Sequence, residues 1–240
     1  MKGLNSHIIQ NNNIVIEAEY LSMSIENKEY GINLNFQKTK ILDNIELGLG
    51  TPLAIQIYLN ETQVDKIHLI ATSIEAENDN LNILAKFDDN KVSYFREYSS
   101  KVYDIFIKWR NNFDIDWRSF KTTEKKIGWI RACNRKNGLQ AITSEGEKFH
   151  LDCTEIKSKI DFFCYIGEVL FGKTGYMGSF ETEFEDCLIY ICHANPRHRS
   201  TIVIHNFESL EKLNERNFVS DFKNRFLERM RESDFNIIFN

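Results

Sequence analysis

The segment that decides the fold of this chain is GYMGSFETEFEDCLIYICHANPRHRSTIVIH, residues Gly175–His205. It opens with a glycine-punctuated loop and continues into an acid-rich stretch, Phe180–Cys192, whose apolar residues recur every three or four positions. It ends in an apolar run, Thr201–His205. The first spacing is typical of an amphipathic helix, and the second is typical of a short strand. The segment therefore predicts a helix followed by a strand.

The same alternation of strands and helices extends over residues 147–240. Strands are expected at Glu147–Leu151, Thr201–His205 and Phe235–Phe239. Helices are expected at Asp161–Phe171, Phe180–Cys192 and Phe218–Arg231, with a short helical stretch near Leu210. Strands separated by helices imply a parallel sheet. We therefore expect an α/β domain with a three-stranded parallel sheet, whose apolar last strand is buried on both faces.

The first 146 residues show a different pattern, in which apolar and polar residues alternate between polar turns. Segments with this spacing are Ile14–Tyr20, Leu21–Ile25, Tyr30–Phe36, Ala54–Leu59, Ile67–Ile74 and Leu81–Phe87. The spacing predicts strands, and the change of phase after Tyr20 predicts a bulge or a sheet corner. This part of the chain is therefore expected to be mostly antiparallel β.

One helix is expected in this first part, because Val102, Ile105, Phe106, Trp109 and Phe113 fall on one helical face. Asn137 and Gly138 suit a type I′ turn, so we expect a hairpin there. Two polar runs are candidate domain boundaries, Lys121–Lys126 and Ser144–Gly146, and we favour the second. The overall prediction is a two-domain α+β protein, with a β-rich domain over residues 1–146 and an α/β domain over residues 147–240.

The composition indicates a globular protein. A chain of 240 residues with 42% hydrophobic content can bury one large core or two small ones. It has no apolar run of about 18 residues and no signal-peptide pattern at its start, so we expect a cytoplasmic protein with no membrane segment. The odd count of 5 cysteines favours reduced, mostly buried thiols.

Charge is distributed unevenly along the chain. The net charge is −5, and residues 147–240 hold 16 acidic against 12 basic side chains. No Lys or Arg lies between Lys173 and Arg197, and this interval holds Glu181, Glu183, Glu185 and Asp186. An acidic surface favours a basic partner and disfavours direct binding of nucleic acid, because phosphates would be repelled.

The predicted helix Phe180–Cys192 has two distinct faces. At about 100° per residue, one face holds Phe180, Phe184, Cys187, Leu188 and Ile191, and the other holds Thr182, Glu185, Asp186 and Ile189. Ser179 suits the N-cap, and acids in the first turn interact favourably with the helix dipole. An ordinary solvated face accounts for Glu181 and Glu183 in this way. It accounts less well for Glu185 and Asp186 beside an outward-facing Ile189, so a binding face stays open as the second interpretation.

The segment Gly175–Leu188 resembles the barstar family of ribonuclease inhibitors. The resemblance rests on Tyr176, on Gly178, on the acid-containing helix start and on the Asp186-Cys187-Leu188 triplet, with the same spacing from Gly178 to Asp186. It covers residues 147–240. It implies that the helix and its preceding loop occupy the active site of a small basic ribonuclease, as in an immunity protein that neutralises a bacterial toxin.

The resemblance also implies individual roles. Asp186 matches the helix aspartate that occupies the place of the substrate phosphate, and Thr182 stands where the family usually has a second Asp. Glu185 occupies a position that is often aromatic or polar in the family. Glu228 corresponds to the family's acid on the last helix. The expected partner-binding residues are thus Tyr176, Gly178, Thr182, Glu185, Asp186, Ile189 and Glu228.

Other classes of function have weaker support in the sequence. The sequence has no phosphate-binding glycine loop, nucleophile elbow or dinucleotide fingerprint, so we expect neither an enzyme nor a cofactor. Cys192, His193, His198 and His205 lack the spacing of a zinc site, so no metal is expected. The main alternative is a non-inhibitory scaffold that uses a barstar-like module to bind another protein. The oligomeric state and the role of residues 1–146 stay open.

A nucleic-acid platform is a further alternative. Trp109, Trp117 and Trp129 lie near Lys108, Arg110 and Arg118. Aromatic rings interleaved with cations can stack on bases, but basic residues beside core aromatics are also common solvated flanks. Trp109 belongs to an apolar helical stripe, which favours the core interpretation.

Overall fold

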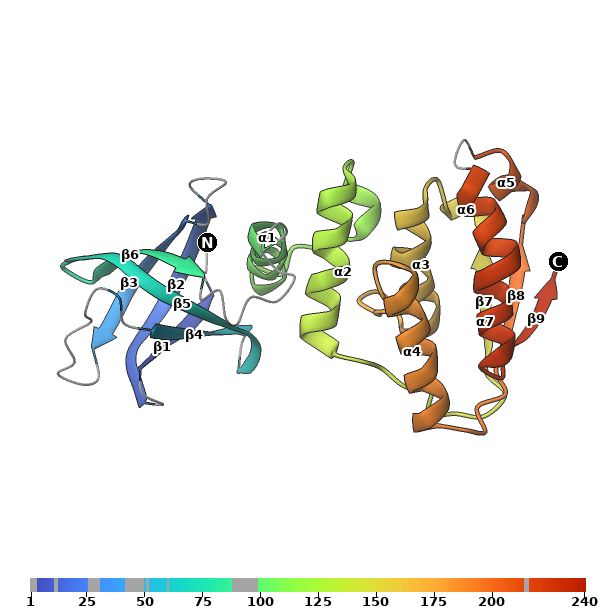
Figure 1. Ribbon diagram of the computed structural model, residues 1–240, viewed down its shortest axis with the longest axis horizontal. Coiled ribbons are helices and arrows are strands. Elements are labelled where there is room, and N and C mark those ends of the chain that lie inside the picture. Colours follow the sequence, from blue (N-terminus) through green and yellow to red (C-terminus); the bar gives the residue numbers. More distant parts are fainter. Residues whose placement is uncertain are drawn as a thin grey trace. The chain divides into compact units, whose positions relative to one another are not determined.

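The computed structural model describes residues 4–10, 13–25, 31–41, 50, 52–59, 61–87, 99–213 and 216–240. The chain divides into two compact units, Met1–Ile115 and Asp116–Asn240, each of which is described by itself (Figure 1). In the described ranges, no helix combines the length and the apolar composition that a bilayer crossing requires.

The first unit is a closed barrel of six antiparallel strands in the order β1-β2-β3-β6-β5-β4. The strands are β1 (Asn5–Gln10), β2 (Asn13–Ile25), β3 (Gly31–Ile41), β4 (Pro52–Leu59), β5 (Thr62–Glu77) and β6 (Asn80–Phe87). Pairing of β1 with β4 closes the barrel. The predicted antiparallel β structure is confirmed, but β1 was not foreseen. The predicted strand start at Tyr30 lies outside the described residues.

Buried side chains alternate along much of the length of the barrel strands. Ser6, Ile8 and Gln10 are buried at alternate positions of β1. In β2 the residues Ile16, Ala18 and Leu21 are all buried, so the predicted change of phase occurs within one continuous strand. The predicted helix is confirmed as α1 (Ser99–Arg110), with Val102, Ile105 and Phe106 buried, but Phe113 lies beyond its end and is exposed.

The second unit holds a three-stranded parallel sheet in the order β7-β8-β9. Its strands are β7 (Lys148–Asp152), β8 (Thr201–His205) and β9 (Asn236–Phe239). Its longer helices after β7 are α3 (Lys159–Phe171) and α4 (Glu181–Ala194). The shorter ones are η3 (Cys153–Glu155), α5 (Glu208–Glu211), α6 (Arg216–Asp221), the π-helical turn η4 (Phe222–Phe226) and α7 (Leu227–Glu232). The predicted order of elements is confirmed, with bounds correct to within two residues.

Helices cover one face of this sheet and leave the other face open (Figure 1). Ile202 and Ile204 of β8 are buried, whereas Ile238 and Phe239 of β9 are 44% and 49% exposed. The expectation that the last strand is buried on both faces is therefore wrong. The physical reason is that β9 is an edge strand on a sheet with a single covering layer.

An aromatic cluster forms the core beneath the helices. The ring of Phe162 on α3 lies 5.6 Å from Phe184 of α4 and 5.0 Å from Phe226 of η4, measured between centroids. Phe222 meets the same ring edge-on at 5.4 Å. These contacts bind α3, α4 and η4 into one apolar layer, since each aromatic ring buries a large area.

Residues 116–146 differ from prediction. They form the 3-10 turn η2 (Trp117–Ser119) and the helix α2 (Thr123–Asn137), where a hairpin at Asn137 and Gly138 was expected. Thr122 caps the start of α2, and Gly138, with φ 64°, ends it. Glycine at positive φ serves a helix C-terminus as well as a tight turn, so the Asn-Gly pair was ambiguous.

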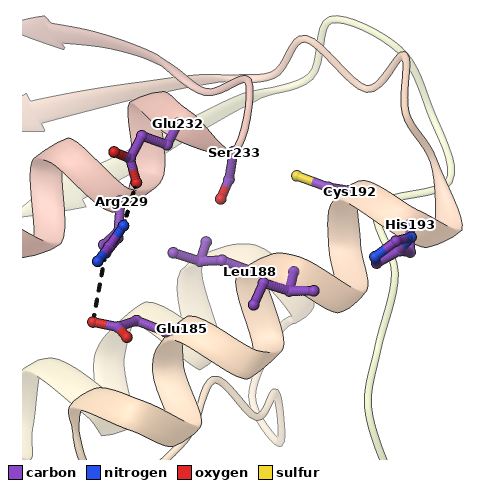
Figure 2. Close-up of a pocket in the computed structure, with 8 residues that line it drawn as sticks. Glu185, Leu188, Cys192, His193, Arg229, Glu232 and Ser233 are labelled. Atoms are coloured by element: carbon purple, nitrogen blue, oxygen red, sulfur yellow. Dashed lines mark hydrogen bonds and ion pairs between the residues drawn. The ribbon is translucent and has the colours of Figure 1, made fainter.

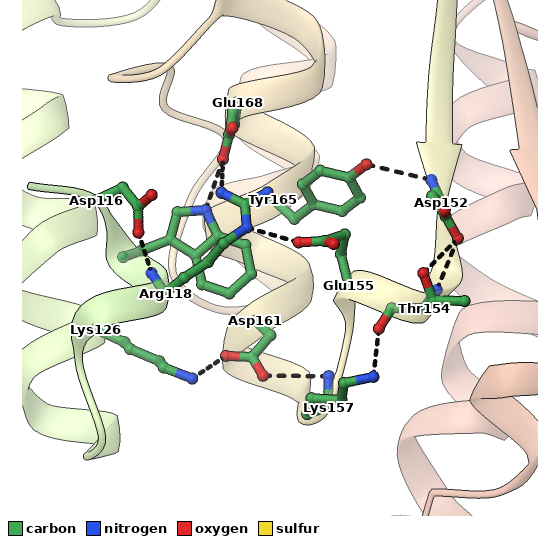
Figure 3. A network of polar contacts seen from close by, with 11 residues as sticks. Asp116, Arg118, Lys126, Asp152, Thr154, Glu155, Lys157, Asp161, Tyr165 and Glu168 are labelled. Carbon is green, nitrogen blue, oxygen red and sulfur yellow. Dashed lines mark hydrogen bonds and ion pairs between the residues drawn. The ribbon is translucent and has the colours of Figure 1, made fainter.

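The segment before Glu147 belongs to the second unit, which begins at Asp116 and not at Glu147. Arg118 donates to Glu155 at 2.6 Å and to Glu168 at 2.8 Å, and the indole of Trp117 donates to Glu168 at 2.7 Å (Figure 3). Lys126 pairs with the buried Asp161 of α3. These bonds join Trp117, Arg118 and Lys126 to η3 and α3, which explains why this segment belongs to the second unit.

The burial of the tryptophans bears on the nucleic-acid alternative. Trp117 and Trp129 are buried in the second unit, and Trp109 is half-buried on α1. Buried rings are not available for stacking on bases. In this structure Trp117 and Trp129 therefore act as core residues.

Candidate protein-binding face

The loop before α4 is held by close backbone packing. Gly178 has φ 85°, and a Cβ there would lie 2.5 Å from the amide nitrogen of Phe184. A Cβ on Gly167 of α3 would lie 2.6 Å from the carbonyl oxygen of Gly175. Both contacts require glycine, because any side chain would push the loop away from the helices. The loop is thus fixed against α3 and against the first turn of α4.

The first turn of α4 is organised by Glu183 and not by Ser179. The helix begins at Glu181, with Phe180 as N-cap and no side-chain cap. The amide and the hydroxyl of Ser179 donate to Oε2 of Glu183, at 2.9 and 2.7 Å. Arg131 of α2 donates to Oε1 of the same carboxylate at 2.5 Å. Glu183 therefore joins the loop, α2 and α4.

Tyr176 lies beneath this arrangement. Its side chain is buried, at 4% exposure, and its hydroxyl donates to Glu183 at 3.3 Å. Burial raises the pKa of the Tyr176 hydroxyl, and the charge of Glu183 raises it further. The hydroxyl thus stays a neutral donor. Tyr176 and the buried Gly178 support the helix start in this structure and do not lie on its surface.

The outer face of α4 brings Thr182, Asp186 and Ile189 together as exposed residues. Ile189 is 54% exposed, and the next residue, Tyr190, is also exposed. Within the described residues, the side chain of Asp186 makes no hydrogen bond or ion pair. The outer face therefore presents a carboxylate that has no internal partner, next to apolar side chains. We call Thr182, Asp186, Ile189 and Tyr190 the α4 face.

The other acids of α4 are neutralised within the molecule. Glu181 pairs with Lys159, and Glu183 pairs with Arg131. Burial opposes ionisation of Glu181, yet the hydrogen bond from Lys159 lowers its pKa below the ordinary value. Glu185 accepts a bond from Arg225 at 2.8 Å, with Arg229 at 3.7 Å. The acids of α4 were predicted from the sequence. Their cationic partners were not, because they come from elements distant in the chain.

A groove adjoins the α4 face. It has a volume of about 470 Å³ and is lined by Glu185, Leu188, Ile189, Cys192, His193, Arg229, Glu232 and Ser233 (Figure 2). Arg229 lies between the carboxylates of Glu185 and Glu232. Burial raises the pKa of the Cys192 thiol, which makes it a poor nucleophile. The groove thus extends the α4 face with apolar and paired charged side chains.

Glu228, the remaining predicted residue, is exposed on α7. No hydrogen bond or ion pair joins it to α4 within the part of the chain that the structure describes. The predicted set thus divides into three: the exposed or half-buried Thr182, Glu185, Asp186 and Ile189 on α4, the buried Tyr176 and Gly178, and Glu228 on α7. Tyr190 was missed, although it follows Ile189 directly.

No protein-family model matches this chain, and no curated protein is significantly similar to it in sequence. Among the described residues, no three His, Cys, Asp or Glu side chains come together in an arrangement that could hold a metal ion. The α4 face and the resemblance of the Gly175–Leu188 segment are therefore the features of the chain that bear on its function.

Proposed function

We propose that the second unit inhibits a small basic ribonuclease by inserting the α4 face into the active site of the enzyme. The observation that carries the proposal is the exposed carboxylate of Asp186, which has no internal hydrogen bond or ion pair among the described residues. The resemblance of Gly175–Leu188 to the barstar family supplies the partner class. On this proposal the protein acts in the cytoplasm as an immunity protein against a bacterial ribonuclease toxin.

The physical basis is mimicry of phosphate by carboxylate. A ribonuclease needs Arg, Lys and His side chains to hold a phosphate and to stabilise developing negative charge. The carboxylate of Asp186 can accept hydrogen bonds from the same groups. Ile189 and Tyr190 beside it exclude water from the contact, and water exclusion strengthens a central charged anchor. The inhibitor thus acts by occlusion and needs no catalytic residue of its own.

The internal ion pairs of α4 single out Asp186 among the acids of the helix. With Glu181, Glu183 and Glu185 neutralised and Thr182 uncharged, Asp186 carries most of the free negative charge of the helix. We therefore expect one dominant anchor and a weaker salt dependence of association than a fully acidic helix would give.

The test is co-expression with small ribonuclease toxins, above all one encoded beside this gene, followed by RNA cleavage with purified proteins. Wild type should rescue growth and block cleavage, whereas Asp186→Arg should do neither. Glu145→Arg is the matched control, because Glu145 is an exposed acid on a loop outside α4 and its substitution makes the same change of charge. Equal rescue by wild type and Asp186→Arg would reject the α4 face as the inhibitory surface.

The affinity of the complex measures how much Asp186 contributes to binding. Asp186→Ala should weaken the complex by about 2 to 5 kcal/mol, because the cations of the partner are left buried and unpaired. Titration calorimetry at two salt concentrations measures this change. A loss below about tenfold, or roughly 1.4 kcal/mol, would reject Asp186 as the anchor.

A protein-binding scaffold is the alternative function. Its specific support is that Lys159, Arg131 and Arg225 already neutralise three of the acids, so these acids have a structural role without any ribonuclease. The alternative predicts that no ribonuclease forms a complex at low salt, while the α4 face still binds another protein.

A further inference from the structure

Two histidines meet on the open face of the parallel sheet, the face that the helices leave uncovered. His150 lies on β7 and His205 at the end of β8, with their rings stacked at 5.2 Å and 17°. Nδ1 of His150 lies 2.9 Å from Nε2 of His205. His150 is exposed and His205 is half-exposed, so solvent reaches the pair. The α4 face plays no part in this site.

The hydrogen bond between the two rings depends on their tautomers. When both imidazoles are neutral, one of the two facing ring nitrogens donates and the other accepts. Nδ2 of Asn240 lies 2.9 Å from Nδ1 of His205. A half-turn of this amide places its oxygen at Nδ1 instead, where it accepts the Nδ1 proton and leaves the Nε2 lone pair of His205 free. Both facing nitrogens can then act as acceptors toward a single cation.

The surroundings of the pair also favour a cation. Asp152 is the register partner of His205 in the sheet. Its carboxylate accepts hydrogen bonds from the side chain of Asn206 and from the amide of Thr154, both at 2.9 Å, and places a negative charge next to the histidines.

We propose that His150 and His205 form a two-histidine site for a divalent late transition metal ion, with Cu²⁺ as the best fit. Two nitrogens 2.9 Å apart can each lie about 2.0 to 2.1 Å from one ion at an angle close to a right angle. Such an angle suits the tetragonal geometry of Cu²⁺ better than the tetrahedral geometry of Zn²⁺. Water completes the coordination, and Asn240 orients His205 through its second ring nitrogen.

The site was missed from the sequence because its ligands are 55 residues apart and come from different strands. Only the parallel register of β7 and β8, in which His150 faces Val203, brings His205 within reach. A bound ion would bridge these strands. Cu²⁺ should therefore raise the melting temperature of the second unit, because a ligand that binds only the folded state stabilises it.

The experiment is titration of the tag-free full chain with Cu²⁺ at neutral pH, followed by calorimetry and by electron paramagnetic resonance. We expect one ion per chain with two nitrogen ligands, and a loss of affinity of at least about tenfold in His150→Gln and in His205→Gln. His193→Gln, at an exposed histidine on α4, is the control and should bind like wild type. Circular dichroism verifies that the variants fold.

Two results would overturn the proposal. One is wild-type protein that binds no Cu²⁺. The other is binding whose affinity and nitrogen signal are the same in wild type and in both variants of the pair. A rise in melting temperature with Cu²⁺ that is lost in His205→Gln and kept in His193→Gln would support it independently of any activity.

Discussion

Glu183 and Asp186 stand one turn apart on α4 and have opposite environments. Glu183 accepts hydrogen bonds from Arg131, Ser179 and Tyr176, whereas Asp186 faces solvent. The first residue organises the fold, and the second is available to a partner. Stability and binding should therefore separate between two carboxylates of one helix.

Glu183→Ala tests whether this carboxylate stabilises the fold. The change removes an acceptor from the loop and leaves the largely buried Arg131 without its ion pair, so it should cost about 2 to 4 kcal/mol of unfolding free energy. Asp186→Ala should stay within about 0.5 kcal/mol of wild type, as is usual for exposed side chains. Urea unfolding followed by circular dichroism measures both values, and equal losses would contradict the assignment.

Residue positions on α4 could be predicted because they depend only on helical spacing. Thr182, Asp186 and Ile189 are exposed, and Phe184, Cys187, Leu188 and Ile191 are buried, as the spacing indicated. Phe180 is exposed, contrary to the prediction, because it precedes the helix as its N-cap. The pairing of Glu185 with Arg225 could not be predicted, since it depends on how η4 packs on α4.

At the scale of elements, periodicity identified each strand and the helical segments after β7, except for the short 3-10 turn η3, and it predicted one helix where α6, η4 and α7 follow one another. It missed α2, because the hairpin signal of Asn137 and Gly138 outweighed the helical spacing of Trp129 and Cys133. It also missed closure of the barrel. Closure depends on pairing between β1 and β4, which no local pattern encodes.

The loop before α4 packs closely against α3 at Gly175. A Cβ on Gly175 would overlap the backbone of Gly167 and lie 2.8 Å from Cβ of Phe171. Gly175→Ala should therefore destabilise the second unit by about 1 to 3 kcal/mol or more through overpacking. Gly146→Ala is the control, because its added Cβ meets open space and only its φ of 69° is unfavourable. Thermal melts compare the two, and a smaller effect at Gly175 would show that the loop is not held by this contact.

At the scale of the whole molecule, buried thiols set an alkaline limit to stability. Burial raises the pKa of Cys153 and Cys187 from 9.0 to about 12, and it also raises those of Cys133 and Cys164. The folded chain then holds these protons more tightly than the unfolded chain. The stabilising effect is complete below about pH 9 and is lost as the pH rises through the raised values.

We therefore expect the free energy of unfolding to fall as the pH is raised from about 9 to about 11. Urea titrations at several pH values measure the slope. Cys187→Val should reduce it, whereas Cys192→Val, at a more accessible thiol of the same helix, should change it less. A slope that is the same in all three proteins would show that thiol ionisation does not limit the stability of the fold.

The second unit should need residues 116–146 in order to fold, because α3 is apolar nearly all round. Its residues Ile160, Phe162, Phe163, Cys164, Ile166 and Leu170 are all buried. One side of such a helix faces the sheet, and another must be covered by a second layer. That layer is α2, whose Lys126 also pairs with Asp161, a side chain that is only 3% exposed.

A fragment of residues 116–240 should therefore melt cooperatively, whereas a fragment of residues 147–240 should aggregate or melt without cooperativity. The shorter fragment exposes the apolar side of α3 that α2 covers and removes the ion pair between Lys126 and Asp161. A large exposed apolar patch should make it aggregate. Cooperative melting of the unaltered 147–240 fragment would instead place the domain boundary at Glu147 and make α2 an accessory helix.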